Sequence, residues 1–239
     1  MSSPKKALLM VGSPRGRDSS SEALGGYLLD RLKERCMETE KVYIHPSMLT
    51  EGGQAEILQA IDRSDLLVLA FPLYVDSLPA PVIAVLETIA EHRRTKMRKE
   101  QKLVAVTNSG FPEASQMDTA LAICRRFASE TKIRWAGGLA IGGGEPLHGR
   151  SLAEAGWMAR NPRKALDMAA TALAEDKPVP KEAVDIAAKP LIPRWMYVFV
   201  ANRGFKSQAK KHGVQDKLYD RPYQALFSTK NRIREPLIR

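Results

Sequence analysis

Apolar runs with β-branched residues alternate with amphipathic segments from residue 1 to residue 175 of the chain. The apolar runs predict strands over residues 6–11, 41–44, 66–71, 103–107 and 133–141. The amphipathic segments predict helices over residues 21–37, 54–64, 79–94, 116–130 and 162–175. Such regular alternation is typical of an α/β domain built on a parallel sheet.

The strands themselves are apolar at consecutive positions, as in LLVLAF at residues 66–71. A strand of this kind is buried on both faces, which helices on both sides of a parallel sheet provide. We therefore predict a doubly wound, five-stranded parallel sheet in the flavodoxin-like order 2-1-3-4-5. Ligands of such a sheet lie beyond the carboxyl ends of the strands, at the topological switch point. We expect this domain to occupy residues 1–175.

The composition changes after residue 175. Residues 176–193 contain four prolines, which indicate an extended connection over the surface. Residues 194–239 form a basic, aromatic-rich extension that is too short for a core of its own. Residues 189–239 hold 12 Lys and Arg against 3 Asp and Glu, whereas residues 1–188 hold 25 against 24. The net charge of +10 is therefore concentrated in the tail.

Cysteine and histidine usage limits the chemistry available to the chain. Cys36 and Cys124 both fall in predicted helices and are expected to be buried thiols, which leaves no disulfide framework. The four histidines show no metal-ligand spacing, so we expect no metal site. These residues are His45, His92, His148 and His212. No early segment is long enough to cross a bilayer, and we expect a cytoplasmic protein.

The loop after the first predicted strand, GSPRGRDSSS at residues 12–21, combines glycine with four serines and runs into a helix N-terminus. A plain helix cap needs one hydroxyl, so the supply of four favours a bound anion. The loop lacks both the G-x-G-x-x-G pattern and the Walker lysine, which favours a single terminal phosphate as its ligand. Arg15 or Arg17 could supply positive charge.

Two further loops follow the third and fourth predicted strands. FPLYVDSLPAP at residues 71–81 places Tyr74 where it could lie against a flat ring, although an ordinary turn with a packed tyrosine is favoured for this loop alone. TNSGFPE at residues 107–113 offers tight turns and an apolar Phe111. The strand order brings both loops to the serine loop. IGGGEP at residues 141–146 could also reach this site, but a plain flexible turn is the favoured interpretation.

Together, GSPRGRDSSSEAL, FPLYVDSLP and NSGFPE resemble the phosphate loop, the isoalloxazine loop and the next flavin-side loop of the flavodoxin-like NAD(P)H-dependent FMN reductases. The resemblance extends from the N-terminus to about position 175, and the tail is similar to the short basic tail of some flavodoxin-like oxidoreductases. It implies FMN bound without a covalent link and a homodimer whose partner subunit completes the flavin pocket. The residues implied for the phosphate are Ser13, Arg15, Ser19, Ser20 and Ser21, and those implied for the ring are Pro72, Leu73, Tyr74, Val75, Asp76, Asn108, Ser109, Gly110 and Phe111. The compact cysteine cluster of related iron-sulfur flavoproteins is missing, so no iron-sulfur relay is expected.

The function that this resemblance implies is an FMN-dependent NAD(P)H oxidoreductase. It would pass electrons from NADPH or NADH through FMN to a small-molecule acceptor such as a quinone, a flavin, an azo compound or a metal ion. No catalytic side chain is expected, because the cofactor carries the chemistry. The alternative is a flavodoxin-like electron carrier or FMN-binding module that docks on a redox partner without oxidising NAD(P)H. The basic charge argues against this alternative, since small flavodoxin carriers are generally acidic.

The basic tail leaves a separate set of alternatives. Its aromatic residues and cations could bind an anionic membrane surface as a peripheral contact, or nucleic acid. We favour a dimer arm, or a wrap over the main domain, with its cations in solvent. Nucleic acid is not expected as a partner.

Overall fold

The computed structural model describes residues 4–95, 99–144, 147 and 150–221. The chain forms two compact units, Met1–Ile192 and Pro193–Arg239. His148, the end of the glycine segment at 145–146 and the end of the tail at 222–239 lie outside the described residues.

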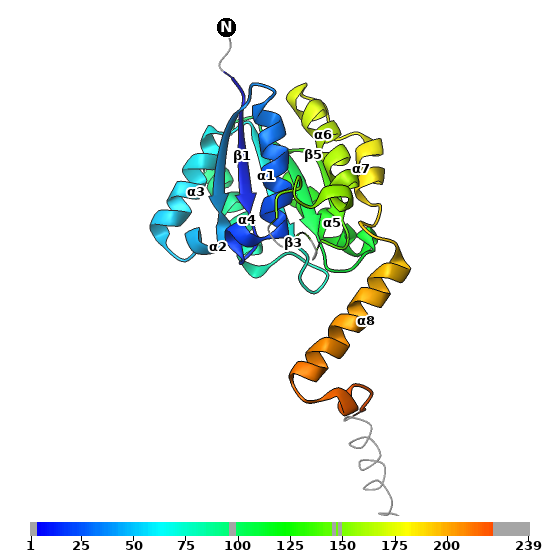
Figure 1. Ribbon diagram of the computed structural model, residues 1–239. Helices are drawn as coiled ribbons and strands as arrows, with labels where there is room; N and C mark the ends of the chain where they lie inside the picture. Colours follow the sequence, from blue (N-terminus) through cyan, green and yellow to red (C-terminus); the bar gives the residue numbers. More distant parts are fainter. Residues whose placement is uncertain (1–3, 96–98, 145–146, 148–149, 222–239) are drawn as a thin grey trace, which may run out of the picture. The chain divides into compact units, whose positions relative to one another are not determined.

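The first unit contains a five-stranded parallel sheet in the order β2-β1-β3-β4-β5, as predicted (Figure 1). Its strands are β1 (Lys6–Val11), β2 (Glu38–Tyr43), β3 (Leu66–Pro72), β4 (Lys102–Asn108) and β5 (Arg134–Ile141). The prediction from apolar runs is confirmed for all five strands, and β1 has the predicted bounds. Burial on both faces is also confirmed for the central strands, because residues 66–71 of β3 are all buried.

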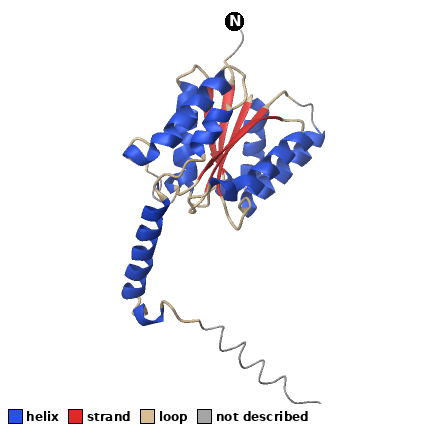
Figure 2. Cartoon of the chain, turned by 90° about the vertical axis from the view of Figure 1, so that its right-hand side faces the viewer, coloured by secondary structure: helices blue, strands red, loops and turns tan. Residues whose placement is uncertain are grey.

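Helices cover both faces of this sheet, so that the strands lie between two helical layers (Figure 2). On one face α1 (Ser20–Lys33), α6 (Arg160–Ala174) and α7 (Lys181–Ala187) bury their apolar sides. On the other face lie α2 (Ile44–Ser47), α3 (Glu51–Arg63), α4 (Ala80–Thr95) and α5 (Asp118–Glu130). Side chains of β1 alternate between the layers, because Leu9 packs on the first face and Leu8 on the second.

Two predictions are wrong: that the first helix extends to residue 37, and that Cys36 is a buried thiol within it. The helix ends at Lys33, and Cys36 lies in the following turn with φ of +63° and an exposed side chain. The turn is needed because the chain must reverse to enter β2, which begins at Glu38. Cys124, in contrast, is buried in α5 as expected, and burial raises the pKa of its thiol to about 12.

We predicted an extended connection over residues 176–193. This prediction is wrong for residues 181–187, which form α7. Ala183, Ile186 and Ala187 are buried against the same apolar cluster as α1 and α6. The prolines do not prevent this helix, because Pro178 and Pro180 precede it and Pro190 and Pro193 follow it. The segment is tied to the sheet by the amide of Val179, which donates to the carbonyl of Ala136 over 2.7 Å.

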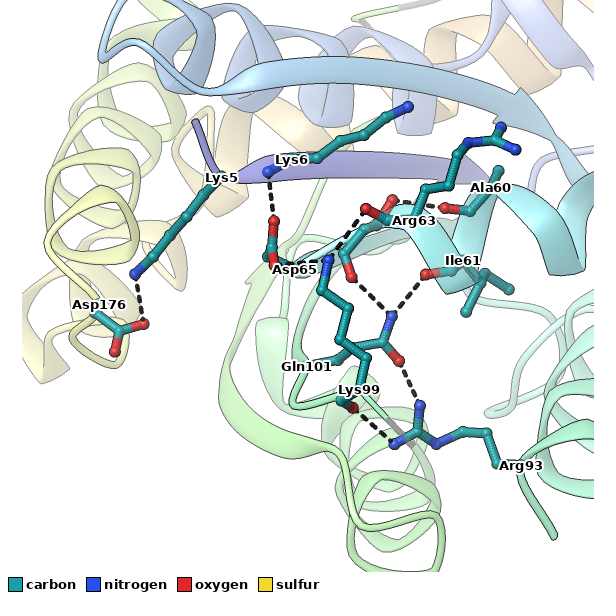
Figure 3. Close-up of polar contacts among 11 residues, drawn as sticks. Lys5, Lys6, Ala60, Ile61, Arg63, Asp65, Arg93, Lys99, Gln101 and Asp176 are labelled. Atoms are coloured by element: carbon teal, nitrogen blue, oxygen red, sulfur yellow. Dashed lines mark hydrogen bonds and ion pairs between the residues drawn. The ribbon is translucent and has the colours of Figure 1, made fainter. Parts of the chain in front are cut away.

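At the amino ends of the strands, a set of polar contacts joins β1, β3 and β4 (Figure 3). Asp65 accepts a hydrogen bond from the Lys6 amide at 2.7 Å and pairs with Lys99 at 2.8 Å. Partial burial acts to raise the pKa of Asp65, but the contacts with Lys99 and Lys6 outweigh it and lower the pKa. Gln101 donates to the carbonyls of Ile61 and Ser64. These contacts fix the start of the sheet, opposite to the predicted site.

The second unit contains α8 (Arg194–Lys211) and a short 3-10 turn, Gln215–Lys217. Among its described residues, only Ala209 is buried. No helix of the described residues combines the length and the apolar character that crossing a membrane requires.

Two adjacent glycines in α1 provide a test of this packing. A Cβ at Gly25 would lie 2.7 Å from Ala70 Cβ and 2.7 Å from Leu9 Cδ1, whereas one at Gly26 would meet the flexible ends of Glu22, at 3.3 Å, and Lys41, at 3.7 Å. We expect Gly25→Ala to lower the free energy of unfolding by about 1–3 kcal/mol through overpacking. Gly26→Ala should raise it by up to about 1 kcal/mol, because alanine favours the helix. Urea unfolding measures both, and equal effects of the two substitutions would contradict the packing of α1 on β1 and β3.

Candidate functional site

The strand ends define where a ligand can lie. β3 ends at Pro72, which pairs with Asn108 at the end of β4, and Asn108 in turn pairs with Ile141 at the end of β5. β1 and β3 are neighbours, and the connection after β1 leads to β2 on one side whereas the connection after β3 leads to β4 on the other. The loops after β1, β3 and β4 therefore meet at the topological switch point of the sheet, where ligands of this architecture bind.

The serine loop begins with a close approach of the backbone to β3, because the Gly12 amide donates to the Ala70 carbonyl over 2.7 Å. A Cβ at Gly12 would lie 3.0 Å from Phe71 Cβ and 2.4 Å from Val82 Cγ2 of α4, so no side chain fits at this position. The chain then makes a 3-10 turn at Gly16–Asp18 and enters α1 through Ser19. The Ser19 hydroxyl accepts from the Glu22 amide at 3.1 Å and donates to the Gly16 carbonyl at 2.7 Å. Ser19 is thus an ordinary helix cap.

The hydroxyl groups of the next two serines join α1 to other loops. Ser20 donates to the carbonyl of Gly144 and Ser21 donates to Oδ1 of Asn108, each over 2.8 Å, and both serines are buried. Their protons are therefore engaged within the chain. The Ser13 hydroxyl accepts a 3.3 Å hydrogen bond from the Arg15 amide, and its proton has no acceptor among the described residues.

The backbone amides at this helix N-terminus, also expected from the sequence as phosphate donors, are available in the structure. Across the described part of the chain, the amides of Ser20 and Ser21, the first two of α1, have no hydrogen-bond acceptor. Such amides carry the positive end of the helix dipole and bind anions readily. With the Ser13 hydroxyl and the charge of Arg15, they make a donor set suited to a phosphate. The assignment of phosphate to Ser13, Arg15, Ser19, Ser20 and Ser21 stays a prediction.

The glycine segment after β5 lies against this site, and the favoured interpretation of it as a plain flexible turn is wrong. The amide of Gly143 donates to the Phe111 carbonyl at 2.6 Å, and that of Gly144 donates to the Ser109 carbonyl at 2.8 Å. A Cβ at Gly142 would lie 2.2 Å from the Pro112 carbonyl oxygen, so the approach needs glycine. Three consecutive glycines after the last strand were the signal for this contact.

The loop after β3 forms a tight hairpin that the sequence did not reveal. Tyr74 and Ser77 exchange two backbone hydrogen bonds of 3.0 Å, and the residues between them, Val75 and Asp76, have φ of +49° and +58°. Two successive left-handed residues are the pattern of a type I′ turn, which usually contains Asn-Gly or Asp-Gly. Val75 is β-branched and 97% exposed, so the turn holds strain at its tip.

Most of the predicted site residues line one cleft of about 90 Å³. The lining residues are Ser13, Arg15, Ser19, Ser20, Ser21, Pro72, Leu73, Tyr74, Asn108, Ser109 and Gly110. Val75, Asp76 and Phe111 do not line it. The cleft is well below the roughly 300–1,000 Å³ of sites that enclose a whole organic ligand. It suits a phosphate group, and any ring attached to that group would lie outside it, where Tyr74 and Phe111 are about half exposed.

A larger cleft, of about 400 Å³, lies at the opposite edge of the sheet and is rich in lysine. Its cations are largely paired: Lys5 and Arg134 contact one carboxylate oxygen of Asp176, at 3.4 and 3.0 Å, and Lys102 contacts the same oxygen. Helices α5 and α6 end at this edge, where cations complement the negative ends of the helix dipoles. The positive charge there is accounted for by the fold.

The chain was compared with known proteins. No family model matches the sequence, and no curated protein does. Solved structures do match. An NADH:FMN oxidoreductase in its apo form is 15% identical, with a TM-score of 0.54 over 80% of this chain and 97% of that one. An FMN-dependent NADH-azoreductase from Bacillus anthracis str. Ames Ancestor, in complex with FMN, is 16% identical, with a TM-score of 0.53 over 71% of this chain and 100% of that one.

A third structure, the rubredoxin oxygen:oxidoreductase from Desulfovibrio gigas, is 11% identical, with a TM-score of 0.52 over 72% of this chain and 36% of that one. At these identities the likeness concerns the fold. Together with the strand order, it shows that the chain has the flavodoxin-like fold.

The hydroxyl groups of Ser21 and Ser13 make different hydrogen bonds, which predicts different effects of their substitution on stability. Ser21→Ala leaves the buried Oδ1 of Asn108 without its donor, and we expect a loss of about 1–3 kcal/mol in the free energy of unfolding. Ser13→Ala is the matched control, because its hydroxyl proton has no acceptor among the described residues, and its free energy of unfolding should change by less than about 0.5 kcal/mol. Urea unfolding compares the two, and an unchanged midpoint for Ser21→Ala would refute the structural role of this serine.

Proposed function

We propose that the protein is an FMN-dependent oxidoreductase that takes reducing equivalents from NADPH or NADH and passes them to a small acceptor. The observation that carries this proposal is the phosphate-sized cleft at the switch point, which is lined by Ser13, Ser20 and Ser21. The amides of Ser20 and Ser21 and the hydroxyl proton of Ser13 have no acceptor among the described residues. The exposed aromatic side chains of the two neighbouring loops add a surface for a flat ring.

The residues present fit FMN rather than a dinucleotide. The donor set offers one anion site at the N-terminus of one helix, and the glycine pattern of dinucleotide-binding folds is missing from the loop. A single phosphate at one end of an organic ligand matches this arrangement. Neighbours with the same fold include an NADH:FMN oxidoreductase and an FMN-dependent NADH-azoreductase, which supports the same class of cofactor.

The protein would contribute binding and orientation. The amides of Ser20 and Ser21, the Ser13 hydroxyl and Arg15 would hold the phosphate, and the backbone of Pro72–Tyr74 and Asn108–Gly110 would face the ring system. The chemistry that bound FMN would supply is transfer of reducing equivalents from a nicotinamide to an acceptor such as a quinone, a flavin, an azo compound or a metal ion. No side chain of this chain needs to act as an acid or a base in that exchange, so we assign no catalytic residue.

The visible absorption spectrum of the purified protein, with FMN added if it is colourless, tests the proposal. We expect flavin bands that are retained after desalting and that bleach within seconds of adding NADPH or NADH without oxygen. Persistent bands would favour an electron carrier that does not oxidise nicotinamides. A protein that retains no FMN would overturn the proposal, because the serine loop would then hold another phosphate.

The cleft also predicts which serine contributes to affinity. Ser13→Ala removes a donor to a charged phosphate, which is worth about 1.5–3 kcal/mol, and we expect FMN to bind roughly tenfold to a hundredfold more weakly. Ser115→Ala replaces an exposed serine outside the cleft and should leave the affinity unchanged. Fluorescence titration of FMN measures both, and equal dissociation constants for Ser13→Ala and the unaltered protein would exclude Ser13 from the phosphate site.

A further inference from the structure

The second unit carries most of the net positive charge of the chain. Residues 193–239 hold 11 Lys and Arg against 3 Asp and Glu, whereas residues 1–192 hold 26 against 24. Among the described residues, no ion pair involves a cation of this unit. Residues 222–239 bring four further Lys and Arg and only one Glu, so they add to the excess. The unit therefore presents a net positive charge that its own acids cannot balance.

Helix α8 arranges part of this charge in a stripe along one side. Positions 195, 199, 203, 206 and 210 are three or four residues apart, so at 3.6 residues per turn they share one face of the helix. We term this set of residues the α8 stripe, and all five of them are exposed. Trp195 and Phe199 form its first half, and Arg203, Lys206 and Lys210 form its second half.

The two halves of the helix differ in chemistry. The seven residues at 195–201 read WMYVFVA and contain no charge, whereas residues 203–211 contain four cations and no acid. An anionic lipid surface offers the matching groups, because its phosphates attract Lys and Arg and its headgroup level accommodates aromatic rings. A helix that lies along such a surface can direct both halves of one stripe to it.

A nucleic acid and a second copy of the chain match this stripe less well. Proteins that bind single-stranded nucleic acid combine stacking rings with cations that follow the phosphates, but residues 195–201 hold aliphatic Met196, Val198 and Val200 and no cation. A second copy would bring an equal net positive charge, which repels the first. An anionic lipid surface attracts the cations and also accepts the apolar side chains.

We propose that α8 binds the surface of an anionic phospholipid membrane, with the α8 stripe directed to the lipid. Trp195 and Phe199 would enter the headgroup level, and Arg203, Lys206 and Lys210 would contact the phosphates. The helix would lie along the surface as a peripheral contact. This proposal concerns the second unit and does not depend on the cofactor.

Sedimentation of the full-length protein with vesicles tests this contact. The probes are vesicles of phosphatidylcholine alone and vesicles of phosphatidylcholine with about one-third phosphatidylserine. We expect binding to the anionic vesicles to be at least about tenfold tighter than to the neutral ones, and to weaken as salt is raised. Equal binding to the two kinds of vesicle, or no binding to the anionic kind, would overturn the proposal.

Two double variants separate the α8 stripe from the overall charge of the chain. Lys206→Gln/Lys210→Gln removes two cations of the stripe, and because each cation strengthens binding to an anionic surface about fivefold, we expect a roughly 25-fold loss of affinity. Lys33→Gln/Arg125→Gln is the matched control, because it removes two exposed cations of the first unit, and it should bind the anionic vesicles like the unaltered chain. Equal losses for the two variants would refute the stripe as the contact.

The aromatic half of the stripe separates a lipid surface from a nucleic acid. Trp195→Ser/Phe199→Ser should weaken binding to the anionic vesicles at least about tenfold, and the remaining binding should be more sensitive to salt, because only charge then holds the helix. A fluorescent oligonucleotide is the competing probe. The proposal is wrong if the oligonucleotide binds the unaltered chain more tightly than the anionic vesicles do, or if this variant binds the vesicles normally. Far-ultraviolet circular dichroism of each variant checks that its helices are retained.

Discussion

The buried hydrogen bond between Ser21 and Asn108 is the contact on which the geometry of the site depends. It joins the first turn of α1 to the end of β4 over 2.8 Å, and both residues are buried. Asn108 also accepts from the Leu73 amide through its backbone carbonyl, so that the loop after β3 is held by the same residue. Because a buried amide oxygen is costly to leave unpaired, these loops keep one arrangement.

This constraint explains how the serines divide between structure and binding. Ser19 caps α1, and Ser20 and Ser21 tie it to the glycine segment and to β4, so their hydroxyl protons serve the fold. Their backbone amides are thereby held in the first turn of α1, where they have no acceptor among the described residues and can donate to an anion. A site assembled in this way binds through fixed backbone dipoles, which need no reordering when a phosphate arrives.

The two units of the chain differ in what stabilises them. The first has two apolar clusters, one on each face of its sheet, whose side chains are buried by residues of the same unit. In the second, a helix with an uncharged aromatic half has almost no buried residue of its own among those described.

The pattern of residues alone was enough to specify the sheet and the loops that line the cleft at its carboxyl edge, because strands buried on both faces are continuously apolar and polar loops follow them. It could not reveal α7, a helix of seven residues between prolines of which three are buried, nor the hydrogen-bond partner of each serine hydroxyl. Those depend on which groups from distant segments lie within hydrogen-bonding distance, such as Gly144 beside Ser20. Ser20 and Gly144 are 124 positions apart in the sequence, so no local pattern of residues connects them. Only the tertiary structure brings such groups together.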